Sequence, residues 1–182
     1  MMLRTLTACL ALCLSPSLAA AQDWNIDRDA SSVGFETTAF GGPVAGEFSD
    51  WSAQITLDPT ALETAQISAR VQTATGATGS NGVDDPMLGT DGLAPAAHPL
   101  ALFESGDIRA TETGYDAHGV LTIRDVSQPV VLPFTLEIAN GHAIADARLT
   151  IARTDYGVGA PGWGTTAANV TLVLHIEADA AE

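Results

Sequence analysis

The sequence contains no lysine and very little positive charge. Its seven basic residues are all arginine, against 22 aspartates and glutamates, which gives a formal net charge of -15. A surface this acidic repels phosphate backbones and anionic lipid headgroups, so neither nucleic-acid binding nor stable membrane insertion is expected. Solubility is the simplest role for the charge, and a docking role for it stays open.

Long hydrophobic runs are also missing, apart from one short run near the N-terminus. A basic start precedes this run, which extends to Leu18, and Ala19-Ala20-Ala21 then supplies the small residues of a cleavage site. The run is too short to span a bilayer, which is typical of a removable export signal. We therefore expect residues 1–21 to be a signal peptide and residues 22–182 to be one exported domain.

Cysteine is nearly absent, because Cys9 and Cys13 both lie inside the segment that cleavage would remove. The mature chain would then have no thiol for a disulfide, a metal or nucleophilic catalysis, and its roughly 160 residues suffice for a domain held by its own core. Lipoprotein processing is an alternative, since Leu6-Thr7-Ala8-Cys9 has the required residue types, although few residues precede it.

Apolar and polar residues alternate with period two along nearly the whole mature chain, which predicts strands. Tight hairpins are indicated between them, most clearly by Asn140-Gly141. Consecutive hairpins make neighbouring strands antiparallel, and eight strands can close without an exposed edge. We predict an all-β fold, a single eight-stranded antiparallel β-barrel, with strands at about 31–38, 46–58, 64–73, 100–110, 113–123, 129–139, 142–154 and 168–178.

One connection, residues 75–98, is much longer than the others and rich in Gly, Asp and Pro. Its few large apolar residues are Met87, Leu88 and Leu93. Insertions of this length are usually functional lids or disordered segments. We favour a partly helical lid over one end of the barrel.

The strand alternation predicts an apolar interior with room for a ligand. Many of the expected inward residues are small: Ala65, Ala69, Ala143, Ala145 and Ala147. They either leave a cavity for a long apolar ligand, or let the helix or lid pack closely, or face solvent. The ligand-binding residues expected from strand phase, lid and mouth are Phe35, Phe48, Leu88, Leu93, Phe103, Leu121, Phe134, Arg153, Tyr156 and Trp163.

Two roles are possible for Arg153. It either donates hydrogen bonds to a ligand headgroup at the mouth, or pairs with Asp155 or another acid to fix the following Gly-rich loop; we prefer the second. Of the four histidines, only His175 shares a strand face with an acid, Glu177. A zinc site needs three or four converging ligands, so no metal site is expected.

Five short motifs follow one another along the chain: Trp24-Asn25-Ile26-Asp27 with Ser31 or Ser32 and Phe35, Gly46-Glu47-Phe48, Pro99 to Phe103 with Ser105, Gly119 to Ile123, and Arg153-Thr154-Asp155-Tyr156-Gly157. In their order and spacing, the chain from Trp24 to Ala178 resembles the YceI-like family. Two features expected of that family are changed: a first-strand His is Ala39 here, and a basic-Gly pair is Arg124-Asp125.

The resemblance implies a lipocalin-like periplasmic barrel that binds polyisoprenoids, quinones or similar amphiphiles. It also implies a membrane cytochrome of the b561 type as a candidate partner. Together with the apolar interior, it favours a non-enzymatic carrier for an isoprenoid quinone or other polyisoprenoid, with no metal or covalent cofactor. The alternatives are a barrel enzyme, such as an isomerase or cyclase, and an interaction module that regulates such a cytochrome. The oligomeric state stays open, a homodimer included.

Overall fold

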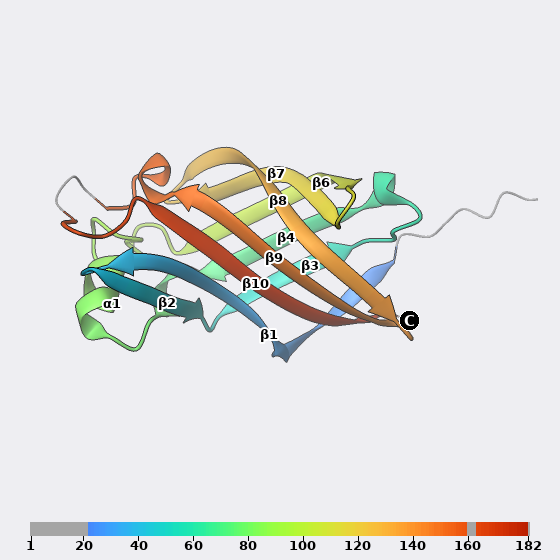
Figure 1. The fold of residues 1–182 in the computed structure, drawn as a ribbon, viewed down its shortest axis with the longest axis horizontal. Helices are drawn as coiled ribbons and strands as arrows, with labels where there is room; N and C mark the ends of the chain where they lie inside the picture. The colour runs from blue at the N-terminus through green and yellow to red at the C-terminus, as the bar shows by residue number, and fades with distance from the viewer. Residues whose placement is uncertain (1–21, 160–162, 182) are drawn as a thin grey trace, which may run out of the picture.

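The computed structural model describes residues 22–159 and 163–181, so the predicted signal peptide, residues 1–21, lies outside the described residues. Strands dominate this part of the chain (Figure 1). The strands are β1 (Asp23–Ala39), β2 (Gly42–Phe48), β3 (Trp51–Thr56), β4 (Gln66–Gln72), β5 (Gly76–Ala77), β6 (Leu100–Ala110), β7 (Tyr115–Ile123), β8 (Val126–Ala139), β9 (His142–Ala152) and β10 (Asn169–Ala180).

Helices are few and short. One α-helix, α1 (Asn81–Leu88), and three 3₁₀ turns, η1 (Leu62–Thr64), η2 (Thr73–Thr75) and η3 (Arg153–Tyr156), occur in the described ranges. No helix in these ranges is both long enough and apolar enough to cross a membrane.

The sheet closes on itself as an antiparallel barrel. Its order is β10-β9-β8-β7-β6-β4-β3-β1-β2-β5, and a further pairing of β10 with β1 completes a ring of eight strands, β1, β3, β4 and β6 to β10. This confirms the predicted eight-stranded antiparallel barrel. Six of the predicted strand segments coincide with β4 and β6 to β10 to within three residues at each end.

The N-terminal strands differ from the prediction. β1 begins at Asp23 rather than near residue 31, because Trp24 and Ile26 pair with Ala180 and Ala178 of β10. A shift of register between Asp27 and Ser32 then bends β1. Its first residues pair with β3 and its second half pairs with β2, so one strand has three neighbours.

The single strand predicted at 46–58 is wrong, because the chain breaks at Ser49-Asp50 into β2 and β3. There the Gln72 amide donates to the Asp50 carbonyl, 2.9 Å, and the Asp50 amide donates to the Thr75 hydroxyl, 3.2 Å. Partners from a distant segment therefore replace the ladder at this point. β2 continues beyond the ring and pairs with β5.

Two-residue turns with left-handed backbone close three of the hairpins. The predicted Asn140-Gly141 turn has φ values of 54° and 79°. The β1–β2 turn, Phe40-Gly41, has nearly the same pair, 53° and 80°, and Arg124-Asp125 joins β7 to β8. Asn140-Gly141 lies at one end of the barrel, and the other two turns lie at the opposite end together with the segment between β4 and β6.

The end near Asn140-Gly141 is filled by a packed core. Large side chains from several strands and the loops between them meet there, and the Trp24 indole donates to the Leu57 carbonyl, 2.9 Å. Tyr115 stacks on Phe134 with ring centroids 5.3 Å apart. The buried members of this cluster are Leu57, Ala65, Ile108, Ala117, Leu132, Phe134 and Ala147.

The outer wall of β9 and β10 has a row of alternating carboxylates and histidines. His142 lies 2.9 Å from Asp179 and 3.2 Å from Glu177. His175 lies 2.7 Å from Asp146 and 3.2 Å from the other Glu177 oxygen. The row is extended, and within the described ranges no three His, Cys, Asp or Glu side chains converge as a metal site requires.

These contacts raise the pKa of both histidines. For His142 the largest cause is the hydrogen bond with Asp179, followed among the favourable contacts by that with Glu177. For His175 the hydrogen bond with Asp146 comes first and that with Glu177 second. Because the folded pKa lies above the unfolded value of about 6.5, the row stabilises the fold below that pH and the contribution is lost as pH rises through the folded pKa.

We predict that the double variant His142→Gln/His175→Gln loses this pH-dependent part of the stability. The free energy of unfolding, measured by urea titration from pH 5 to pH 9, should fall below that of the unchanged protein at the acidic end, and the difference should shrink toward alkaline pH. His118→Gln, a change on β7 away from the row, is the matched control. An identical pH dependence for the double variant and the unchanged protein would contradict the assignment.

Candidate functional site

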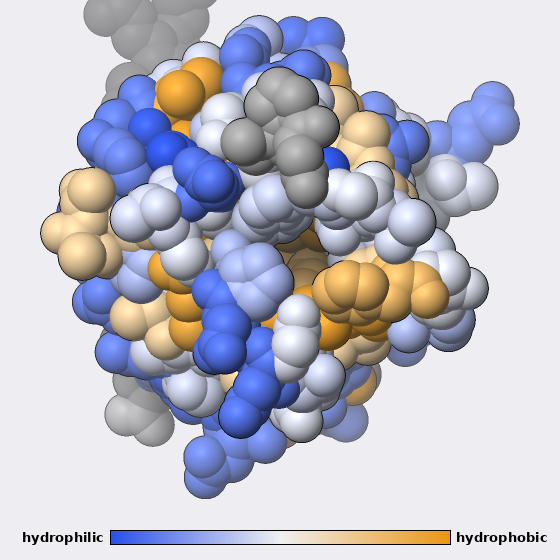
Figure 2. Space-filling model, turned by 90° about the vertical axis from the view of Figure 1, so that its left-hand side faces the viewer, coloured by the Kyte–Doolittle hydropathy of each residue, from blue (hydrophilic) through white to orange (hydrophobic). Residues whose placement is uncertain are grey.

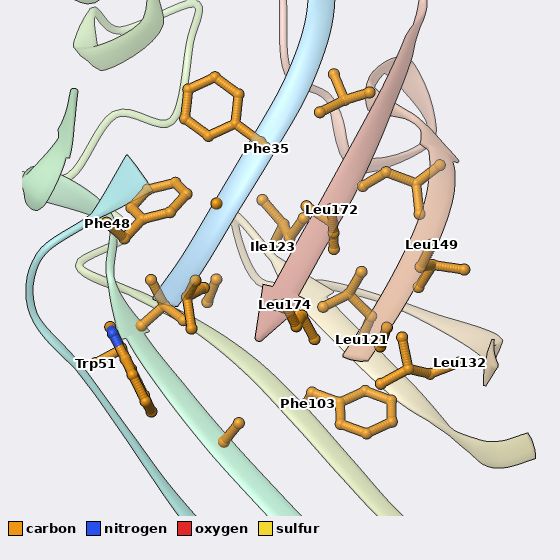
Figure 3. Close-up of a pocket in the computed structure, with 18 of the residues that line it drawn as sticks. Phe35, Phe48, Trp51, Phe103, Leu121, Ile123, Leu132, Leu149, Leu172 and Leu174 are labelled. Atoms are coloured by element: carbon orange, nitrogen blue, oxygen red, sulfur yellow. The ribbon is translucent and has the colours of Figure 1, made fainter. Parts of the chain in front are cut away.

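The barrel encloses a cavity of about 750 Å³ that extends from the packed end toward the opposite end. All eight strands of the ring contribute side chains to its wall, every second residue pointing inward. Figure 3 shows rings from β1, β2, β3 and β6 and leucines from β7 to β10 directed into this space; those labelled are Phe35, Phe48, Trp51, Phe103, Leu121, Ile123, Leu132, Leu149, Leu172 and Leu174.

Alanines make the interior hollow. Ala143, Ala145 and Ala147 follow each other along the inner face of β9, and Ala69 faces the cavity from β4. Ala65 does not line it, because it is part of the packed core at the closed end. The structure thus supports a cavity at Ala69, Ala143 and Ala145, close packing at Ala65, and both at Ala147.

Phe35 and Phe48 form an aromatic pair near the open end, with ring centroids 5.6 Å apart. Phe35 covers Gly46 of the neighbouring strand, where an added Cβ would come within 2.5 Å of its ring. Gly76 of β5 accommodates Phe48 in the same way, since an added Cβ there would come within 2.7 Å of the Phe48 ring. Glycine at these two positions therefore lets the rings lie flat against the wall.

Nine of the ten predicted ligand-binding residues line the cavity. Leu88 does not, because the inner face of α1 is formed by Val83, Pro86 and Met87. These positions follow the helical period, which places Leu88 off that face. Contact of the nine with a ligand stays a prediction; they are Phe35, Phe48, Leu93, Phe103, Leu121, Phe134, Arg153, Tyr156 and Trp163.

Arg153 fixes the mouth through main-chain carbonyls, so the expected ion pair with Asp155 or another acid is not the interaction that holds it. Its Nε donates to Ala167, 2.9 Å, and its Nη1 to Val158, 2.8 Å. Nη2 donates to Thr166, 3.3 Å. Five N–H groups in a rigid fork suit several carbonyls at once, and the guanidinium joins η3 to the loop that leads into β10.

Trp163 lies under this guanidinium, with the Arg153 Cζ 5.0 Å from the ring centroid. Gly159 completes the arrangement, since an added Cβ would lie 2.1 Å from Nη1 and 2.8 Å from the indole. Its φ of 79° is also one that L residues rarely adopt. The predicted mouth residues Arg153, Tyr156 and Trp163 are therefore brought together, with Arg153 in the structural role.

The described lining residues include few polar groups, most of them toward the open end. They are Thr37, Ser52, Thr73, Arg153, Tyr156, Thr165 and Thr166, together with the indoles. Burial, followed by the charge of Asp155, raises the pKa of the Tyr156 hydroxyl, which keeps it neutral near physiological pH. The wall thus offers apolar surface along its length and neutral hydrogen-bonding groups near the mouth.

The segment between β4 and β6 covers the mouth and is fastened on several sides. β5 pairs with β2, the Gly159 amide donates to the Asp91 carbonyl, and Arg124 donates to the Gly92 carbonyl. His98 pairs with Asp125 at 2.7 Å. The predicted lid is therefore anchored at both ends, and α1 is the part between the anchors.

Sequence reasoning missed several lining residues. Trp51 shares the phase of Ala53 and Ile55 and could have been found by extending that alternation. Phe40 lies in a turn, where strand period gives no signal, and Met87 was recognised only as a member of the lid.

Comparison with known proteins identifies similar chains. A family model described as the YceI-like domain matches residues 24–178. A UPF0312 protein of Ectopseudomonas mendocina is 30% identical over 137 residues, covering 72% of each chain. BcnA of Burkholderia cenocepacia superimposes with a TM-score of 0.79 at 25% identity, covering 84% of this chain and 99% of BcnA.

A more distant solved structure has the same fold. It is a polyisoprenoid binding domain from Saccharophagus degradans, implicated in plant cell wall breakdown, with a TM-score of 0.65 at 12% identity over 89% of this chain and all of that domain. The family model covers most of the chain, including every strand of the barrel ring. The chain therefore belongs to the YceI-like family.

Proposed function

We propose that this protein is a carrier that holds one long apolar lipid, an isoprenoid quinone or another polyisoprenoid, non-covalently inside its barrel. The observation that carries the proposal is the barrel cavity of about 750 Å³, whose wall is apolar on all eight strands. Small-molecule pockets run to roughly 300–1,000 Å³, so the space suits a single ligand. The similar polyisoprenoid binding domain supports the same ligand class.

The cavity volume limits how much of the lipid can be enclosed. A cavity of about 750 Å³ encloses one ligand chain of limited length. A longer isoprenoid would fold back or protrude through the mouth. A quinone headgroup would lie beside Tyr156, Thr165 and Thr166, because the neutral polar groups lie there.

Burial of the chain provides the binding free energy. Enclosing about fifteen carbons at roughly 0.8 kcal/mol each supplies about 12 kcal/mol. Association costs of about 4 kcal/mol or more leave a tight complex. No metal or covalent cofactor enters this account.

The lining residues favour binding over catalysis by an isomerase or cyclase. Such an enzyme needs an acid or base within reach of the substrate. Among the described lining residues the ionisable side chains are Arg153 and Tyr156. The first donates to main-chain carbonyls, and the pKa of the second is raised.

A periplasmic location completes the proposal, on the strength of the predicted export signal in residues 1–21. In that compartment a b561-type membrane cytochrome would be a fitting partner for a quinone carrier. Mass spectrometry of lipid extracted from protein purified out of its own periplasm tests ligand and location together. One dominant prenylated species in stoichiometric amount is expected, and a mixture of ordinary fatty acids would contradict the proposed ligand class.

We predict that Ala145→Phe weakens lipid binding while the fold is retained. The ring would occupy space in the cavity, and losing about three buried methylenes at roughly 0.8 kcal/mol each lowers affinity about fifty-fold. Ala45→Phe, on the exposed face of β2, is the matched control. Titration with a fluorescent prenyl lipid measures the effect, and equal affinities for the two variants would contradict the position of the ligand.

We also predict that Met87→Ser speeds lipid release, whereas Leu88→Ser does not. The two residues are neighbours in α1 and both half-buried, but Met87 lines the cavity and Leu88 does not. Release into excess lipid acceptor, followed by stopped-flow fluorescence, should be several-fold faster for Met87→Ser. Equal acceleration by both changes would show that general loosening of the helix is responsible, and acceleration by neither would exclude α1 from covering the ligand.

A further inference from the structure

Phe40 is the most exposed large hydrophobic side chain in the described part of the chain. Its exposed fraction is 70%, against 36–44% for Val120, Val126, Val131 and Ile138. It lies at the tip of the β1–β2 hairpin, between Ala39 and Gly41. Burial in this fold therefore does not explain a phenylalanine at this position.

The backbone of Phe40 does not explain it either. Its φ is 53° and that of Gly41 is 80°, the left-handed pair that favours Asn, Asp or Gly at the first position. The same chain builds the same turn from Asn140-Gly141 at the opposite end of the barrel, with φ values of 54° and 79°. A ring in this turn is exposed to water and has an unfavourable backbone, and such a combination occurs where a side chain has another task.

The position of Phe40 indicates that task, because this exposed residue also lines the opening of the cavity. Trp163, Val83 and Met87 belong to the same lining. The hairpin tip and α1 lie at the same end of the barrel (Figure 1). Figure 2 looks onto this end, where hydrophobic residues gather in and beside a hollow and hydrophilic residues surround them.

Charges around the mouth restrict what this surface can approach. The segments at this end of the barrel include five aspartates. They also include Arg124 and Arg153, which both donate to main-chain carbonyls. The aspartates are Asp84, Asp85, Asp91, Asp125 and Asp155. They would repel an anionic bilayer, so a bilayer surface without net charge is the better match.

We propose that Phe40 inserts into the interface of a zwitterionic bilayer and that lipid passes between bilayer and cavity at this contact. Aromatic rings are favoured at the level of the headgroups. One ring gives a weak, reversible attachment, so the protein can bind to the bilayer and leave it repeatedly. The contact would spare the apolar chain a passage through water. This inference rests on the proposed lipid-carrier function.

The test is transfer of a fluorescent prenyl lipid from loaded protein to phosphatidylcholine vesicles, by stopped-flow. For the unchanged protein the rate constant should rise with vesicle concentration, because transfer requires contact. For Phe40→Asn the rate constant should become independent of vesicle concentration. At the highest vesicle concentration it should be about tenfold lower than for the unchanged protein, as expected from losing the insertion of one apolar side chain. Vesicles with added phosphatidylglycerol should be poorer acceptors at low salt.

Phe40→Asn reproduces the Asn-Gly turn of residues 140–141, so its melting temperature should equal or exceed that of the unchanged protein. Val131→Thr, which reduces an exposed apolar side chain on β8, is the matched control and should keep the vesicle dependence. A concentration-independent rate in the unchanged protein, or a persisting dependence in Phe40→Asn, would overturn the inference and leave the carrier function standing. The first of these results would mean that release of the lipid into water limits transfer. Failure of the unchanged protein to take up the probe would overturn both.

Discussion

The ladder between β1 and β10 is the interaction on which the cavity depends. It joins the first strand of the described chain to the last, from Trp24 opposite Ala180 to Glu36 opposite Thr171. Without it the sheet would be open, with two long free edges, and its apolar face would lie in water. Closure turns that face into the wall of an enclosed space, so every inward side chain acquires its role through this one pairing.

Alternation along the strands was enough to predict the wall, because inward and outward residues differ in polarity at nearly every step. Phe103, Leu121 and Phe134 were placed inside correctly for this reason. The break between β2 and β3 was missed, although the inward residues change phase there, from Phe48 to Trp51. The break is set by Gln72 and Thr75, which reach it from a distant part of the chain.

The mouth was harder to predict than the wall. Arg153 is held by carbonyl groups, which every residue has, so its partners leave no signature in the sequence. In the segment over the mouth, one short helix decides which residue faces inward, and a shift of one position exchanges Met87 for Leu88. Phe40 escaped notice because a turn has no period.

The row of alanines on β9 keeps the cavity open at three successive levels along the barrel. Ala143, Ala145 and Ala147 lie at successive levels along the barrel, each with only a methyl group toward the interior. Each methylene added at one of these levels would remove cavity volume at that level. Larger side chains at these positions would shorten the space along the barrel without changing its strands or hydrogen bonds, so β9 limits the length of chain that the cavity can hold.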